Sequence, residues 1–231
     1  MTGLIAAAAA FVLIHLLISG TRARDVLTAR LGPGPYMGLF ALASIAILAW
    51  MGFAYVAARR GEDPVFWAAQ PSTKWIQLLL MLASVFLVVA GLTTPNPGSV
   101  RQEGALERPD LVKGVLRITR HPFLWGVAIW AGGHLMVNGD AASLVLFGAL
   151  FVLAAAGPYS IDAKRRRALG EKWAAFAGQT SAAPFAAILQ GRQSLKLGEI
   201  GAWRIGLAGL IWAGLIFVHP YAFKVSPLPW R

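Results

Sequence analysis

The sequence contains no cysteine, so disulfides, thiolate metal ligands and thiol nucleophiles are all excluded. Charged residues are also scarce: they form 13% of the 231 residues, whereas a soluble domain has about a quarter. Acidic residues are the rarest, with 10 Asp and Glu against 21 Lys and Arg. Hydrophobic residues make up 57% of the chain, which indicates an integral membrane protein. Any metal or cofactor ligand must therefore come from histidine, methionine, tyrosine or a carboxylate.

Six apolar runs approach the ~20 residues that a helix needs to cross about 30 Å of hydrocarbon. They are expected over residues 4–19, 36–57, 75–92, 123–137, 142–159 and 203–219. We interpret the first run as a retained span, because it lacks a basic leader and has no small-residue cleavage site before Arg22. The turn Asn138-Gly139-Asp140 predicts an antiparallel hairpin of the fourth and fifth runs. The expected fold class is all-α, a polytopic membrane helix bundle of about six transmembrane helices forming one domain over residues 1–231.

The basic residues divide unequally between the two sides of such a bundle. The first, third and fifth loops hold 16 of the 21 Lys and Arg, and the opposite side holds the other 5. Short loops rich in Lys and Arg stay in the cytoplasm, so we expect a multi-pass protein of the bacterial inner membrane with both termini periplasmic. Because the charge lies in loops and no nucleic-acid motif is present, the expected partner is the lipid bilayer and not nucleic acid.

Two of the basic loops are long enough to carry cytoplasmic interfacial helices. The third loop ends in LVKGVLRITR, which predicts an amphipathic surface helix. In the fifth loop, the basic residues together with Trp173 and Phe176 predict a helix at the level of the lipid headgroups.

Two histidines, His15 and His134, fall inside apolar runs, where a polar side chain is costly and suggests a functional site. Each lies eleven residues from the start of its run, roughly 17 Å deep, but the two runs start on opposite sides. In a core of ~30 Å the two imidazoles would differ in height by only about 4 Å. This levelling suits two axial ligands of one haem iron. The alternative is a neutral imidazole that is hydrogen-bonded to a neighbouring helix.

Other residues of the fourth run suit a flat cofactor. Gly133 would allow a planar ring to approach the backbone closely, and Trp130 could form a wall of the pocket. Arg120, at the basic surface, could hold a haem propionate together with Arg22 and Arg24, and His121 would shape the inner mouth of the pocket. Ordinary packing of small residues between helices is the alternative for the glycine.

The combined pattern resembles a known family. It comprises Arg120-His121-Pro122-x3-Gly126-x3-Trp130-x3-His134 after the early His15, then Ile161-Asp162-x-Lys164-Arg165 and Ser181-x2-Pro184-Phe185. Over nearly its whole length the chain resembles the NnrU family of bacterial membrane proteins. That family is similar to the plant and cyanobacterial 15-cis-zeta-carotene isomerase.

The resemblance implies a haem b (Fe) with His15 and His134 as its ligands. It also implies either a redox-gated cis-to-trans isomerase acting on an apolar polyene, or an accessory redox role with a partner protein in nitrogen-oxide metabolism, since NnrU proteins are associated with denitrification. The isomerase carries a cysteine three residues before its second haem histidine, and this chain has Ala131 there. A switch between thiolate and imidazole ligands is therefore excluded. Catalytic residues, the substrate and the oligomeric state stay open.

A second resemblance gives a different enzyme class. Arg-His-Pro before a helix, with a later Glu171, is similar to membrane methyltransferases of the isoprenylcysteine carboxyl methyltransferase type, which use S-adenosylmethionine. Here Glu171 is not part of a Glu-Glu pair, and Trp173 and Phe176 stand where tyrosines are expected. The resemblance implies a shared architecture with an altered cofactor site.

Overall fold

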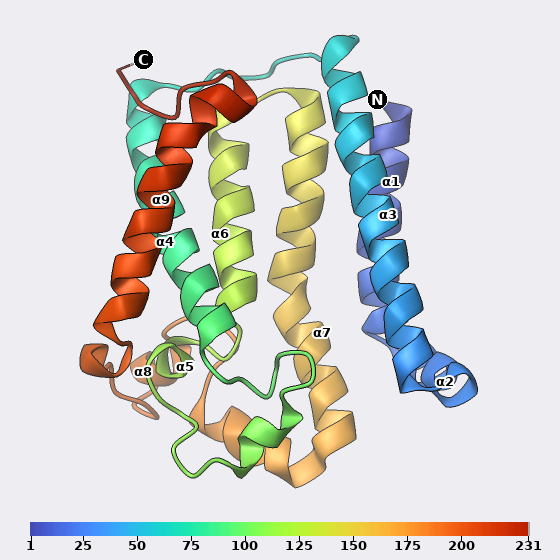
Figure 1. The fold of residues 1–231 in the computed structure, drawn as a ribbon, viewed down its shortest axis with the longest axis vertical. Helices are drawn as coiled ribbons and strands as arrows, with labels where there is room; N and C mark the ends of the chain where they lie inside the picture. The colour runs from blue at the N-terminus through green and yellow to red at the C-terminus, as the bar shows by residue number, and fades with distance from the viewer. Residues whose placement is uncertain (231) are drawn as a thin grey trace.

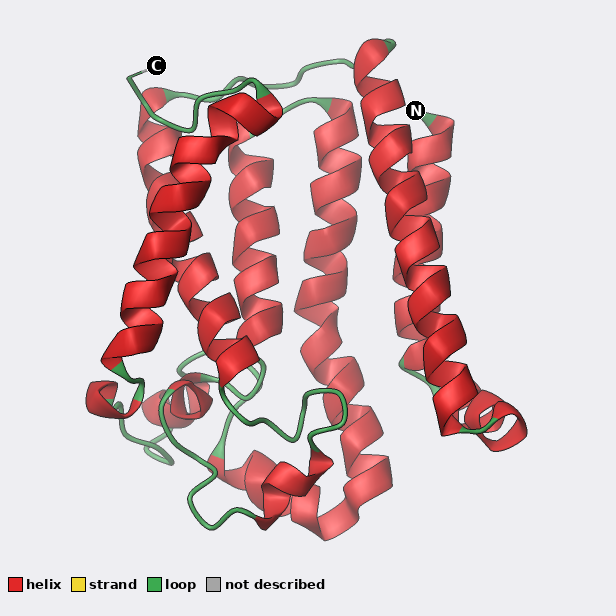
Figure 2. Ribbon diagram, in the orientation of Figure 1, coloured by secondary structure: helices red, strands yellow, loops and turns green. Residues whose placement is uncertain are grey.

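The structure, a computed structural model, describes residues 1–230, and its elements in that range are helices joined by loops (Figure 2). The α-helices are α1 (Thr2–Leu13), α2 (Arg22–Leu31), α3 (Pro33–Arg60), α4 (Pro71–Thr93), α5 (Val115–Ile118), α6 (Pro122–Val137), α7 (Ala141–Gln179), α8 (Ala186–Leu189) and α9 (Ala202–Phe223). The π-helix η1 (Ile14–Ser19) continues α1, and two short 3₁₀ helices are η2 (Glu103–Glu107) and η3 (Leu197–Glu199). The predicted all-α fold class is confirmed.

Five helical segments are long and apolar enough to cross a membrane, namely α1 with η1, α3, α4, α7 and α9. The sixth apolar helix, α6, has 16 residues and is therefore about 24 Å long. It packs between α4 and α7, while α9 covers α4, and α1 packs between α7 and α3 (Figure 1). The structure is thus consistent with the predicted polytopic bundle, and each of the six apolar runs corresponds to one helix.

Proline and small residues explain where these helices begin and how closely they pack. Pro33, Pro71 and Pro122 occupy the first turns of α3, α4 and α6, where a missing amide proton costs nothing. Helix α1 buries its small Ala7 and Ala8 against α3 and α7. The bundle core is therefore built from close helix contacts, while the apolar surfaces of α3 and α9 remain exposed, as lipid contact requires.

The predicted hairpin is present, and the connection from α3 to α4 fastens it. Backbone hydrogen bonds run from Phe66 N to Gly139 O, at 2.8 Å, and from Ala141 N to Pro64 O, at 3.0 Å. Trp67 packs on the turn so closely that a Cβ on Gly139 would lie 2.2 Å from the Trp67 carbonyl oxygen. We call residues 61–70 together with the turn 138–140 the outer clasp. It ties α3 to α6 and α7 at the end opposite the basic loops.

Helix α7 extends 20 residues beyond the predicted span, which ended at Tyr159. Its apolar, membrane-spanning part covers residues 141–159, and its basic remainder bends at Gly170, where φ is +53°. Trp173 and Phe176 do not present their side chains to the surface, because both are buried in a cluster with Leu116. The predicted amphipathic surface helix is replaced by the short, buried α5. The bent end of α7 and the segment around α5 cover each other's apolar side chains.

Candidate functional site

His134 lies inside the bundle, where α4, α6 and α7 meet. Its Nδ1 is 2.8 Å from the Trp130 carbonyl oxygen, and its ring stacks on Phe147 with centroids 4.7 Å apart and an angle of 24°. A carbonyl can only accept, so Nδ1 carries the proton, and Nε2 has no hydrogen-bond partner among the described residues. A neutral imidazole of this tautomer presents Nε2 as a metal ligand.

A glutamine of α4, Gln77, lies next to His134. Gln77 Nε2 lies 3.4 Å from His134 Nδ1, and Gln77 Oε1 is buried without a hydrogen-bond partner. A Cβ on Gly133 would lie 2.3 Å from that oxygen, so the glycine allows the amide to approach α6. Gly133 therefore contacts α4 in this structure, as the helix-packing alternative expects, while Trp130 contacts both His134 and Phe147.

His15 lies in the π-helical segment η1. Its Nδ1 is 2.7 Å from the Phe11 carbonyl oxygen, and its ring meets Phe40 of α3 edge-on, with centroids 5.1 Å apart. The Nδ1 contact fixes the same tautomer as in His134, and Nε2 again has no partner within the described chain. π-Helical turns are rare overall, but those that occur are frequently found at functional sites. Each histidine alone therefore fits the donor chemistry of an axial haem ligand.

The structure does not bring the two histidines together. Their difference in height can be measured along α7, which packs against both of their helices. A Cβ on Gly20 would lie 2.3 Å from Ser160 Oγ, so Gly20 is level with Ser160. His15, five residues earlier, is near the level of residue 155, whereas His134 is level with Phe147. Eight residues of helix correspond to roughly 12 Å. The expected height difference of about 4 Å is therefore wrong, and α7 packs against both α1 and α6 (Figure 1).

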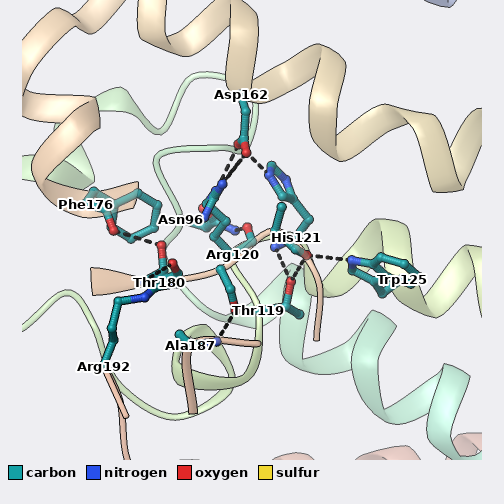
Figure 3. Close-up of polar contacts among 12 residues, drawn as sticks. Asn96, Thr119, Arg120, His121, Trp125, Asp162, Phe176, Thr180, Ala187 and Arg192 are labelled. Atoms are coloured by element: carbon teal, nitrogen blue, oxygen red, sulfur yellow. Dashed lines mark hydrogen bonds and ion pairs between the residues drawn. The ribbon is translucent and has the colours of Figure 1, made fainter. Parts of the chain in front are cut away.

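A second polar site lies at the basic end of α6, where Asp162 of α7 accepts hydrogen bonds from two consecutive residues (Figure 3). Arg120 Nε is 3.0 Å from Asp162 Oδ2, and His121 Nε2 is 2.7 Å from Oδ1. All three residues are buried. Burial alone would raise the pKa of Asp162, but the hydrogen bonds from His121 and Arg120 hold it below its usual value. We call these three residues the inner cluster.

The inner cluster also fastens the loops around it. Asn96 donates from Nδ2 to the Arg120 carbonyl oxygen, at 2.8 Å, and Arg120 N donates to the Ser181 carbonyl oxygen, at 3.0 Å. Thr119 Oγ1 and Trp125 Nε1 each donate to the Ala182 carbonyl oxygen, at 2.8 Å (Figure 3). The motif that begins at Arg120 therefore joins α6, α7 and two loops, and Arg120 is engaged by a carboxylate.

The pattern of helices and motif residues has a counterpart among known proteins. The family model described as NnrU protein matches residues 3–227. The chain belongs to the NnrU family. No solved structure matches. Residues of the sequence pattern described above lie in two locations of this NnrU chain, around His134 and in the inner cluster.

Two curated relatives of this NnrU protein are plant enzymes. The 15-cis-zeta-carotene isomerase of Zea mays, a chloroplast protein, is 28% identical over 206 residues, covering 86% of this chain and 55% of the relative. The corresponding enzyme of Arabidopsis thaliana is 25% identical over 190 residues, covering 80% of this chain and 50% of the relative. The NnrU chain thus spans about half the length of these relatives.

The methyltransferase alternative gains no geometric support. His121 contacts Asp162, which lies nine residues before Glu171 on α7, or roughly 13 Å along the helix. Glu171 itself is exposed, beyond the bend at Gly170.

Two residues of these sites, Asp162 and Gln77, were not among the site residues predicted from the sequence. Each has a signal in the sequence: Asp162 is an acid beside a basic run, and Gln77 is a single amide inside an apolar run.

Proposed function

We propose that this NnrU protein is a haem b-binding membrane protein that isomerises an apolar polyene, with His134 as an iron ligand. The offset of roughly 12 Å along α7 keeps His15 from the same iron in the described structure. The observation that carries the proposal is the state of the His134 imidazole, which donates from Nδ1 to the Trp130 carbonyl oxygen and leaves Nε2 without a partner among the described residues. The similarity to two 15-cis-zeta-carotene isomerases supports the substrate class.

The residues around His134 would orient the ligand and exclude water. Trp130 supplies the carbonyl that fixes the tautomer, and Phe147 holds the ring plane by stacking. Bound haem would supply a redox-active iron. A cis-to-trans change of one double bond gains and loses no atoms.

We further propose the location as the bacterial inner membrane, with the basic loops in the cytoplasm and both termini in the periplasm. The unequal division of Lys and Arg supports this orientation. The start of α1 and the end of α9 lie at the same end of the bundle, opposite the basic loops (Figure 1). An accessory role in nitrogen-oxide metabolism would use the same haem, and the isomerase assay below separates the two.

The test is the visible spectrum of the protein purified after expression with haem supplied. We expect sharp reduced-minus-oxidised bands in the wild type and their loss in His134→Ala, whereas His15→Ala should retain them. His219→Ala is the matched control, because His219 is also a helix histidine whose Nδ1 contacts a carbonyl, that of Val225, but it lies at the exposed end of α9. Full haem retention by His134→Ala would refute the assignment.

Activity is tested separately with 15-cis-zeta-carotene in detergent micelles. Chromatographic separation of the isomers should show conversion by reduced, haem-loaded protein and none by His134→Ala. Haem bands without conversion would favour the accessory redox role. Binding of S-adenosylmethionine with no haem bands would instead favour the methyltransferase class.

A further inference from the structure

Three cations from two helices gather on the basic side, where α2 lies beside the part of α7 beyond its membrane-spanning half. Asp25 Oδ1 is 3.7 Å from Arg24 Nη1, and Asp25 Oδ2 is 4.0 Å from Arg167 Nε. Lys164 lies next to them and has no hydrogen bond or ion pair among the described residues. One exposed carboxylate at long range therefore serves three positive groups. We call Arg24, Lys164 and Arg167 the cation cluster.

Lys164 is half-buried. Burial and the neighbouring Arg24, Arg165 and Arg167 together lower its pKa to about 8, although Asp25 acts in the opposite direction. Arg165 is itself occupied by Glu103 and the Ser99 carbonyl oxygen. An ammonium group that is partly removed from water beside other cations is stabilised by an anion, and among the described residues the anion near it is the exposed Asp25 carboxylate, which Arg24 and Arg167 share.

The position of the cluster indicates which anion. Gly20 packs on Ser160 where α1 and α7 leave the apolar part of the bundle, and Lys164 follows one helical turn later. The cluster therefore lies at the depth of the lipid phosphates in the leaflet on the basic side. Guanidinium and ammonium groups form strong charge-assisted hydrogen bonds with phosphate oxygens.

We propose that the cation cluster binds the phosphate of an anionic phospholipid headgroup. This inference is independent of haem and of the isomerase reaction. It also differs from the general preference of basic loops for anionic leaflets, which is worth about 1 kcal/mol per residue wherever the residue lies near the surface. Arg166, which adjoins the cluster in sequence, is exposed and has no ion pair among the described residues, so it senses only this general attraction.

The experiment measures lipids that stay bound to the haem-free, detergent-purified protein by native mass spectrometry. Phosphatidylglycerol and phosphatidylcholine with the same acyl chains are added in equal amounts. We expect the wild type to retain phosphatidylglycerol preferentially, and Lys164→Gln and Arg167→Gln to lose this preference about tenfold, the equivalent of ~1.4 kcal/mol for one charge-assisted phosphate contact. Lys164→Arg, which keeps the charge, should retain it.

Arg166→Gln is the matched control, since it removes the same charge one residue away. Equal losses in Arg166→Gln and Arg167→Gln, or equal retention of the two lipids by the wild type, would overturn the proposal. A further arm adds inorganic phosphate at millimolar concentration. Displacement of the lipid would identify free phosphate as the ligand and overturn the headgroup assignment, whereas an unchanged spectrum supports it. Equal melting temperatures of all variants show that binding, and not folding, has changed.

Discussion

The inner cluster predicts a large loss of stability in Asp162→Asn, which removes one charge and almost no volume. The Arg120 and Asp162 side chains are only 10% and 12% exposed. The variant therefore leaves a buried guanidinium without its counter-ion, and breaking a buried pair in this way costs about 3–5 kcal/mol. For a chain of this size each kcal/mol lowers the melting temperature by roughly 2–4 °C. We thus expect a decrease of about 6–20 °C, measured in detergent by the loss of the monodisperse peak after heating.

Two controls separate the loss of the buried charge from a general effect of charge removal. Glu107→Gln breaks the pair with Lys172, whose side chains are 70% and 68% exposed, and it should cost only about 0–1 kcal/mol. The double variant Arg120→Met with Asp162→Leu removes both buried charges and should be more stable than Asp162→Asn. A shift in Asp162→Asn no larger than that in Glu107→Gln would refute the reasoning, as would a double variant that is less stable than the single one.

Two further predictions concern the outer clasp and the segment before α9. Gly139→Ala should lower stability by about 1–3 kcal/mol, because the new Cβ would lie 2.2 Å from the Trp67 carbonyl oxygen, whereas Gly148→Ala meets nothing within 4 Å and should be neutral or stabilising in thermal melts. Hydrogen bonds from Arg117 lower the pKa of Glu199 from 4.5 to about 2. A lowered folded-state pKa stabilises the fold above pH ~4.5, and this contribution is lost as the pH falls towards 2. Melting temperatures between pH 5 and 2 should therefore fall less steeply in Glu199→Gln than in the wild type, and parallel curves would contradict this prediction. Equal melting temperatures of Gly139→Ala and Gly148→Ala would contradict the prediction for the outer clasp.

Most of the bundle was predictable from sequence because the positions of membrane helices depend chiefly on apolar composition. Each of the six runs became one helix, and the Asn-Gly-Asp turn became a hairpin. The end of α7 was not predictable in this way. Residues 160–179 are basic enough to suggest a separate surface helix. The first ten of them continue α7, but the non-helical backbone at Gly170 sets residues 171–179 apart, and their aromatic residues find apolar partners in the distant segment around α5. Such partners are visible only in three dimensions.

The site was predicted in part. Sequence singled out the two histidines inside apolar runs, and each has an Nδ1 contact and an Nε2 without a partner in the part of the chain that the structure describes. The prediction that the two imidazoles lie at nearly the same height was wrong because it assumed spans of ~30 Å. Helix α6 is only about 24 Å long. Two positions that lie roughly 17 Å inward from opposite ends of such a span differ in height by about 10 Å. His121 and Arg120 were placed at the right end of α6, but their shared partner, Asp162, could not be inferred from spacing along the chain.

The outer clasp couples α3 to the hairpin of α6 and α7. The loop after α3 is joined to the α6–α7 turn by backbone hydrogen bonds, and the Arg59 guanidinium lies 2.7 Å from Asp140. At the basic end, Gly20 packs on Ser160, and Arg167 lies 4.0 Å from Asp25. The α1–α3 unit is therefore held at both ends, and a change in the 138–140 turn would reach α3 as directly as it reaches α6 and α7.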